Sequence, residues 1–329
     1  MNPGCPKPEG VKGVDSPAGA EKDRQKGRHN VGLALLTALR PRQWIKNGLV
    51  FLPFLFAVDL AWNPSALEEV PALLFQVLLA ALAFCALSGA VYLFNDLLDR
   101  ESDGNHPTKR HRPLASGQVG TALALSFLAV LSVAGVAVLA LVKPLLGAVG
   151  ILYLSINLVY SLGLKRLVVI DVLLVASGYV IRTVVGALVI GVDPSPWLYT
   201  TTGAAALFVV LGKRYSEVRL AGEDLGAQRH VLRQYPPAFV GQLLNISAGT
   251  ALVSYALYTI EAANLPDNDA MLLTIPLVCF GLFRFLYLVH TSDQAEYPEL
   301  LIAKDLPMVL SVLAWLIVAG AVLLLYGGP

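Results

Sequence analysis

Long apolar segments separated by short polar ones dominate the sequence after about residue 30. Each is long enough to cross a bilayer as a helix, which needs about 20 residues. The sixth segment is the weakest, because three threonines dilute it. The pattern predicts an all-α polytopic membrane protein with nine transmembrane helices, at roughly 44–61, 70–98, 119–142, 145–163, 167–191, 197–212, 238–261, 270–290 and 306–326.

The first 30 residues have a different composition. They contain no apolar run and are rich in Pro, Gly and charged residues. Such a composition is typical of a disordered tail, and it lacks the apolar core and small-residue cleavage site of a secretory signal. We therefore expect a disordered cytoplasmic tail over residues 1–30 and a single transmembrane domain over residues 31–329.

The composition excludes several classes of protein. Hydrophobic residues make up 56% of the chain and charged residues 14%, whereas a soluble domain has about 45–50% and about 25%. The net charge of +1 gives no basic field for nucleic-acid binding. Cys5, Cys85 and Cys279 are far apart, which argues against a disulfide framework or a zinc site.

The positive charges predict the orientation. If the N-terminus is cytoplasmic, 21 of the 24 Lys and Arg residues lie in segments on the cytoplasmic side. Of the other three, Lys143 lies in an outer loop and Arg182 and Arg284 lie within spans. Because Lys and Arg resist translocation, we expect a multi-pass plasma-membrane protein with its C-terminus outside and its polar site facing the cytoplasm.

The sharpest polar feature closes the second apolar segment. Asn95 precedes Asp96, Asp99 and Asp103, whose spacing places the three carboxylates on one face of a continuing helix. Carboxylates this close together at a bilayer repel one another unless a cation neutralises them. Oxygen ligands without His or Cys select a hard ion, so the pattern predicts a Mg²⁺ site. The alternative is a solvated helix end without a metal.

A basic loop follows the acidic cluster at once. It runs from His106 to Gly117 and places Lys109, Arg110 and Arg112 within four positions. Guanidinium and ammonium groups beside a metal are what a diphosphate requires. Retention of positive charge on the cytoplasmic face would also explain these cations, but it would not require the carboxylates.

A second polar cluster surrounds the start of the fifth helix. Tyr160 and Lys165 precede this helix, and Asp171 and Arg182 lie on one face of it, eleven residues apart. An arginine inside a span is costly and marks a candidate functional residue. Arg182 either pairs with a carboxylate and locks the bundle, or points into a cavity and binds an anion.

A third cluster follows the sixth helix, and the first helix adds polar residues at the same face. The chain has no Gly-rich phosphate loop and no zinc-protease or serine-hydrolase motif, which argues against a nucleophilic triad. These residues are candidates for substrate binding: Gln43, Lys46, Lys213, Arg214, Tyr215 and Glu217.

The acidic motif, NDxxDxxxD from Asn95 to Asp103, resembles the first aspartate-rich motif of the UbiA-type intramembrane prenyltransferases. The resemblance covers about residues 33–327 and implies a UbiA-like bundle that forms one catalytic domain. In that superfamily, Mg²⁺ on two aspartate-rich motifs binds a prenyl diphosphate, whose ionisation lets an acceptor be alkylated. The resemblance thus implies Mg²⁺ as the cofactor, with Asn95, Asp96, Asp99 and Asp103 as candidate ligands.

The loop expected after the sixth helix departs from that pattern. Prenyltransferases of the family carry a second DxxxD motif there, whereas this chain reads GKRYSE from Gly212 to Glu217. Three further segments accompany this motif: RQWIKN (residues 42–47), NDLLDRESDxNHPTKRxRPxASG and YSLxLKRxxxxDV. Together with GKRYSE they resemble one branch of the family, the decaprenyl-phosphate phosphoribosyltransferases of actinobacteria. The resemblance implies transfer of 5-phosphoribose from phosphoribosyl pyrophosphate (PRPP) to a polyprenyl phosphate, towards the arabinose donor for cell-wall arabinan.

This activity implies a role for each group of candidates. The acidic motif would hold Mg²⁺ on the pyrophosphate, and the lipid phosphate, already anionic, would attack the ribose without a strong base. The cations expected on the leaving group or the ribose 5-phosphate are Lys109, Arg112, Lys165 and Lys213. The residues expected to orient the lipid phosphate are Lys46, Tyr160, Arg182 and Arg214, while Asp171 and Glu217 would hold ribose hydroxyls or order these cations.

Two competing interpretations keep the same membrane architecture. One is prenyl transfer from a prenyl diphosphate to a quinone or haem precursor, and the altered motif at residues 212–217 argues against it. The other is a transporter for anions or lipids. The expected partners are PRPP, a polyprenyl phosphate and the lipid bilayer, without nucleic acid, and the sequence leaves a homo-oligomer open.

Overall fold

The computed structural model describes residues 31–63, 67–221, 230–262, 265–266, 268–292 and 298–326. This part of the chain is helical, and its only extended pairing is an isolated bridge between Val58 and Trp62. The all-α fold class is therefore confirmed. The predicted disordered tail, residues 1–30, lies outside the described residues.

Seven helices in the described part are long and apolar enough to cross a membrane. They match seven of the nine predicted spans, with limits that differ by three residues at most. The seven are α3 (Val70–Leu98), α5 (Thr121–Val142), α6 (Pro144–Leu162), α7 (Ile170–Ile190), α9 (Pro237–Glu261), η6 with α10 (Ala270–Thr274 and Ile275–Thr291) and α12 (Leu306–Tyr326).

The other two predicted spans take a different form. The first is a 3₁₀ helix, η1 (Pro41–Phe51), followed by the short α2 (Leu52–Leu55). The sixth is α8 (Pro196–Ala221), which continues nine residues beyond the predicted end. The GKRYSE motif, expected in a loop, lies inside this helix, where pairs of Glu217 with Lys213 and Arg214 link successive turns. The count of nine spans and the orientation remain predictions.

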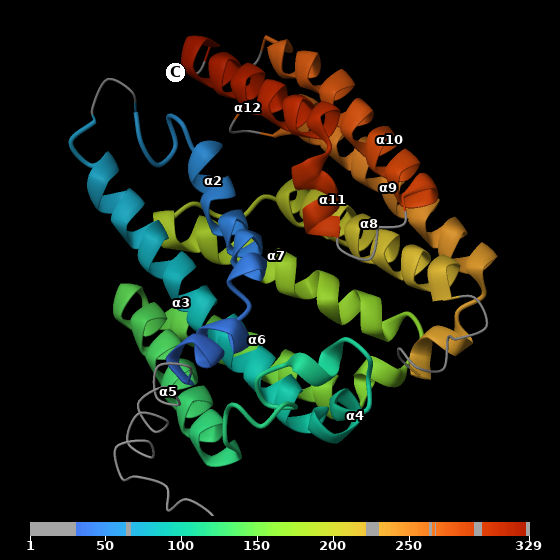
Figure 1. The fold of residues 1–329 in the computed structure, drawn as a ribbon. Coiled ribbons are helices and arrows are strands. Elements are labelled where there is room, and N and C mark those ends of the chain that lie inside the picture. The colour runs from blue at the N-terminus through green and yellow to red at the C-terminus, as the bar shows by residue number, and fades with distance from the viewer. Residues whose placement is uncertain are drawn as a thin grey trace, which may run out of the picture.

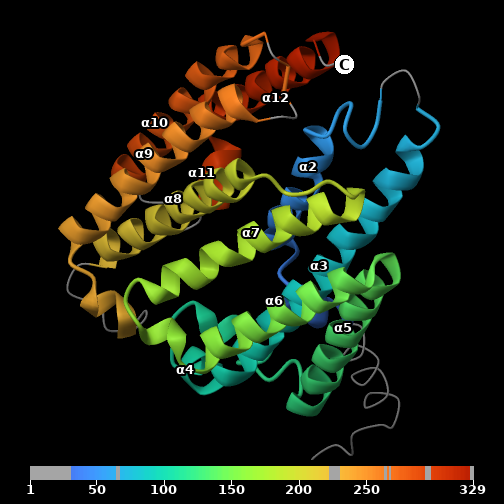
Figure 2. The same cartoon turned by 180° about the vertical axis from the view of Figure 1, so that it is seen from behind.

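The helices form two groups that share α7. Figures 1 and 2 show α3, α5 and α6 on one side of the molecule and α9, α10 and α12 on the other, with α7 and α8 between them. One apolar core, around Phe84 and Leu87, joins α3 to α6, α7 and η1. A second core, around Phe208 and Phe285, joins α8 to α7, α9 and α10.

The polar connections gather at one end of the bundle, because successive helices run in opposite directions. They include α4 (Arg100–Gly104), η2 (Lys109–His111), η3 (Leu164–Arg166) and η5 (His230–Gln234). In this end region α4 contacts η2, and η3 contacts both α7 and η5. The helix α11 (Pro298–Lys304) leads into α12 and touches α8.

Gly186 on α7 permits the closest approach between η1 and the bundle. A Cβ atom at this position would lie 2.2 Å from the carbonyl oxygen of Val50 and 3.0 Å from Cδ of Pro53. Because the obstacle is backbone, a side chain here requires a shift of the whole segment. The first apolar segment, η1 with α2, therefore packs directly against the α7 backbone.

We expect Gly186→Ala to destabilise the protein by about 1–3 kcal/mol, as overpacking of a closed interface does. The measurement is thermal unfolding of the detergent-solubilised protein. Gly249→Ala on α9 is the matched control, since no atom lies within 4 Å of a Cβ built there. Equal melting temperatures for the two variants would contradict the close seating of η1 on α7.

Candidate active site

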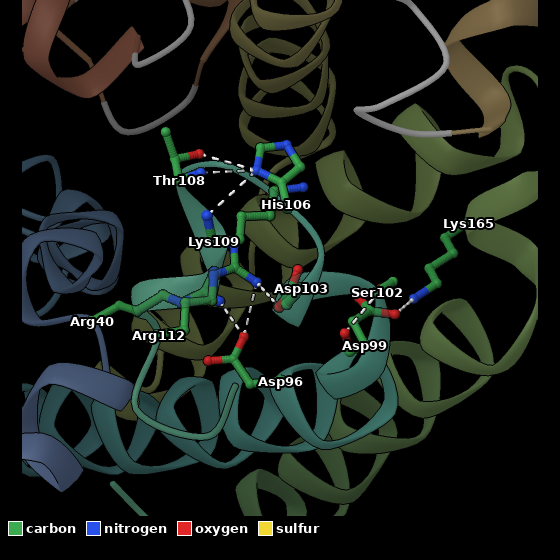
Figure 3. A network of polar contacts seen from close by, with 10 residues as sticks. All are labelled: Arg40, Asp96, Asp99, Ser102, Asp103, His106, Thr108, Lys109, Arg112 and Lys165. Carbon is green, nitrogen blue, oxygen red and sulfur yellow. Dashed lines mark hydrogen bonds and ion pairs between the residues drawn. The ribbon is translucent and has the colours of Figure 1, made fainter. Parts of the chain in front are cut away.

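The acidic motif divides into two groups in the structure. α3 ends at Leu98 and the chain resumes as α4 after a break at Asp99, so Asp96 and Asp103 belong to different helices. Both are buried, and both accept a hydrogen bond from Nη1 of Arg112, at 3.1 and 2.6 Å. Figure 3 shows the Arg112 guanidinium lying between these two carboxylates.

Arg40 is a second cation on the same group, and the sequence analysis did not select it. Its Nη2 donates to Oδ1 of Asp96, and its guanidinium lies 5.0 Å from the ring centroid of Tyr92. The backbone of Arg40 has a φ of 52°, a left-handed conformation that non-glycine residues rarely adopt. The clue in the sequence was its place immediately before Pro41, at the start of the first span.

Asp99 faces the other way, towards the connection between α6 and α7. Its Oδ1 accepts a hydrogen bond from Nζ of Lys165 at 2.7 Å. The Asp99 side chain is 39% exposed, whereas that of Asp96 is 3% exposed. The prediction that the three aspartates share one face of a continuing helix is therefore wrong, because the helix breaks at Asp99; Asp96 and Asp103 are brought together by Arg112 instead.

The basic loop is ordered by His106. Nδ1 of His106 accepts hydrogen bonds from the backbone N–H groups of Thr108 and Lys109, at 3.3 and 3.4 Å (Figure 3). Arg110 is exposed and donates to His111 at 3.4 Å. The loop thus places Lys109 and Arg110 beside the acidic motif, while His106 acts within the loop.

The carboxylates fit a divalent metal only in part. Among the described residues, no three His, Cys, Asp or Glu side chains are close enough together to hold a metal. Mg²⁺, however, is commonly held by one or two carboxylates and completes its shell with waters and substrate phosphates. Asp99, the exposed carboxylate of the motif, suits that arrangement, whereas Asp96 and Asp103 both accept hydrogen bonds from Arg112. Asn95 lies on the last turn of α3.

We call the acidic motif with Arg40, Arg112 and Lys165 the first cluster. The second cluster of the structure is a buried ion network between α7 and α8, which joins Asp171 to Arg214 and Glu217. Nε of Arg214 donates to Oδ2 of Asp171 at 3.0 Å, and its Nη1 donates to Oε2 of Glu217 at 2.5 Å. Nζ of Lys213 lies 3.9 Å from the other oxygen of Glu217. The side chains of Asp171 and Arg214 are 0% and 4% exposed, so the centre of this network is buried, while Lys213 at its edge is 39% exposed.

Tyr235, which the sequence analysis also missed, completes that network. Its hydroxyl donates to Oδ1 of Asp171 at 2.6 Å and accepts from the backbone N–H of Val169 at 2.7 Å. Burial and the hydrogen bond to Asp171 raise the pKa of the Tyr235 hydroxyl above its usual range, so it stays a donor at all physiological pH values. Val169 has a φ of 69°, strained for a β-branched residue, and Tyr235 holds it there.

Arg182 lies in neither cluster. Its guanidinium donates to Asn47, Ser88 and Tyr153 at 2.7–2.9 Å and to the carbonyl of Gly178 at 2.5 Å. These described partners are neutral, and they come from η1, α3, α6 and α7. Asp171, expected on the same face, pairs with Arg214 instead, so the structure does not bring Asp171 and Arg182 together.

The remaining candidates are spread around the two clusters. Nζ of Lys46 lies 5.7 Å from the ring centroid of Tyr179, and Gln43 lies in the preceding turn of η1. Tyr160 is in the last turn of α6 and interacts electrostatically with Arg214. The ring of Tyr215 instead packs 4.6 Å from that of His290, on the α10 side, away from Asp171.

Comparison with known proteins gives a consistent set of relatives. The profile described as the UbiA prenyltransferase family matches residues 50–302. A decaprenyl-phosphate phosphoribosyltransferase of Mycobacterium tuberculosis is 32% identical over 89% of this chain and 95% of its own length. One of Corynebacterium glutamicum is also 32% identical, over 87% of this chain and 85% of its own length.

Solved structures show the same fold. A UbiA homolog from Archaeoglobus fulgidus, bound to DMAPP and Mg²⁺, superimposes with a TM-score of 0.67 at 17% sequence identity. The match covers 88% of this chain and 98% of the other. At this identity the likeness concerns the fold.

We expect Asp171→Asn to destabilise the protein by about 3 kcal/mol, because it leaves buried Arg214 with one charged partner fewer. The measurement is the free energy of unfolding in detergent. Asp305→Asn is the matched control: the Asp305–Arg284 pair is only partly buried, with side chains 13% and 30% exposed, so its loss costs less. An equal effect of the two substitutions would contradict the burial of the network's centre.

Proposed function

The chain belongs to the UbiA prenyltransferase family, and we propose that it transfers 5-phosphoribose from PRPP to a polyprenyl phosphate and releases pyrophosphate. The observation that carries this proposal is the identity of 32–33% to decaprenyl-phosphate phosphoribosyltransferases over 87–89% of the chain. The content of the second cluster supports it. There, two cations balance the two carboxylates, so the cluster presents no net negative charge to a polyanionic substrate.

PRPP binds, in this proposal, at the first cluster. The aspartates of this cluster already form ion pairs with Arg40, Arg112 and Lys165. The adjoining loop carries two more cations, Lys109 and Arg110. Guanidinium groups match phosphate oxygens in a bidentate geometry, while ammonium groups supply point charge. The diphosphate would therefore be held by side chains from η1, η2 and η3.

Mg²⁺ is the proposed cofactor, held by Asp99 with Asp96 or Asp103 and by phosphate oxygens of PRPP. When bound, it neutralises charge on the departing pyrophosphate. Asp99 is the accessible ligand, and Lys165 keeps it oriented. Arg112 holds Asp96 and Asp103 towards each other across the break at the end of α3.

The lipid phosphate, which is the acceptor, needs to be oriented by the protein but does not need to be activated by a base. A lipid phosphate is already anionic, so its oxygen attacks C1 of the ribose without a general base. This agrees with His106, whose Nδ1 accepts backbone hydrogen bonds in the described structure. Lys213 on α8 and Lys46 on η1 are the proposed cations for the lipid phosphate, and Tyr160 in the last turn of α6 is a further candidate.

The proposal includes a location. We place the polar end of the bundle at the cytoplasmic face of the plasma membrane, because 21 of the 24 Lys and Arg residues would lie on that side. PRPP is water-soluble and reaches the site from the cytoplasm, while the polyprenyl chain stays in the bilayer. The product would serve as a precursor of the arabinose donor for cell-wall arabinan.

We expect purified protein with Mg²⁺, labelled PRPP and decaprenyl phosphate to form a phosphoribosyl lipid and release pyrophosphate. Asp99→Asn should lower this rate by about 100-fold or more, because it removes the carboxylate proposed to hold the Mg²⁺ that neutralises the departing pyrophosphate. Asp305→Asn, remote from both clusters, should retain the wild-type rate.

The same preparation tests the alternative. The A. fulgidus homolog is described with a prenyl diphosphate, DMAPP, so prenyl transfer is the second candidate. Alkylation of an aromatic acceptor by a prenyl diphosphate, without any phosphoribosyl lipid from PRPP, would overturn the proposal.

A further inference from the structure

The second cluster has the donors of a cation site, but a protein side chain fills it. Asp171 on α7 and Glu217 on α8 converge, and the Arg214 guanidinium lies between them. We propose that Arg214 takes the place of a second divalent cation, so that the site holds a single metal ion together with PRPP. This inference rests on the proposed function for the identity of the diphosphate substrate.

Every oxygen of the two carboxylates already has a partner. Asp171 Oδ2 accepts from Arg214 and its Oδ1 from Tyr235, at 3.0 and 2.6 Å. Glu217 Oε2 accepts from Arg214, and its Oε1 lies 3.9 Å from Lys213. A metal at these oxygens would therefore compete with the Arg214 guanidinium, the Tyr235 hydroxyl and the Lys213 ammonium.

Burial makes displacement of the guanidinium unfavourable. The side chains of Arg214, Asp171 and Glu217 are 4%, 0% and 9% exposed. A metal entering here would leave the guanidinium buried and without its carboxylates, which is strongly destabilising. The ammonium of Lys165 on Asp99, by contrast, is on a long flexible stem, and Asp99 is 39% exposed, so that carboxylate can be shared with an incoming ion.

The charge balance indicates what Arg214 achieves in place of a second divalent cation. Asp171 and Glu217 alone would present two negative charges to a substrate that carries several phosphates. Arg214 and Lys213 bring this cluster to neutrality with cations that cannot dissociate from the site. The repulsion between the cluster and the polyanionic substrate is therefore removed without a metal.

The test counts bound Mn²⁺ by the loss of the free-ion electron paramagnetic resonance signal, with saturating PRPP and the full-length protein. We expect one Mn²⁺ per chain for the wild type. Two Mn²⁺ per chain would overturn the inference. Glu217→Gln should still bind one, because Glu217 holds no metal, and a fall to zero would also overturn it.

Removal of the guanidinium gives the complementary result. We expect Arg214→Ser to bind a second Mn²⁺, because Asp171 and Glu217 then lack their cation, and Arg214→Lys to bind one. Arg284→Ser is the matched control, since it removes an arginine that pairs with Asp305 and with neither carboxylate of the cluster, and it should bind one. A count of one for folded Arg214→Ser would overturn the inference; if that variant does not fold, the wild-type and Glu217→Gln counts decide.

A second titration with geranyl diphosphate in place of PRPP separates this inference from the proposed function. One Mn²⁺ per chain with geranyl diphosphate and none with PRPP would overturn the proposed substrate, yet it would support the role of Arg214. Two Mn²⁺ with either diphosphate would overturn the role of Arg214 and leave the transfer reaction standing.

Discussion

Charge neutralisation at the end of an apolar bundle is the constraint on which the rest of this structure depends. A carboxylate carried into a low-dielectric region costs several kcal/mol unless a cation meets it. Each carboxylate of the two clusters forms an ion pair with a basic side chain of the described structure. Several of these cations come from elements that are distant in the sequence. Arg40 reaches Asp96 across 56 residues, and Lys165 reaches Asp99 across 66.

These pairings also order the connections between the helices. Lys165 ties the η3 turn to the end of α3, and Tyr235 ties Val169, four residues after Lys165, to the segment before α9. The α6–α7 connection is therefore held from two sides, by the first cluster and by the second. The two clusters thus share this one short segment, between Lys165 and Val169.

The apolar pattern predicted the fold well, because a bilayer-spanning helix needs only length and hydrophobicity. Seven spans were placed within three residues of their limits. The η1 segment and α8 were misjudged, since hydropathy reports neither a 3₁₀ conformation nor ion pairs that extend a helix into a polar region. Sequence spacing likewise selected the acids and most of the cations, but it missed Arg40 and Tyr235. Their partners are 56 and 64 residues away, a distance over which local periodicity carries no information.

Arg182 shows why a charge inside the bundle does not need an opposite charge. Its guanidinium is only 5% exposed, and its described partners are the oxygens of Asn47, Ser88, Tyr153 and Gly178. Four such acceptors replace much of the hydration that the group would have in water. They also use most of its five N–H donors, so little capacity is left for a bound anion. Arg182 therefore acts as a cross-link between η1, α3, α6 and α7, and the anion-binding capacity of the molecule lies with the cations that are more exposed, at the end of the bundle.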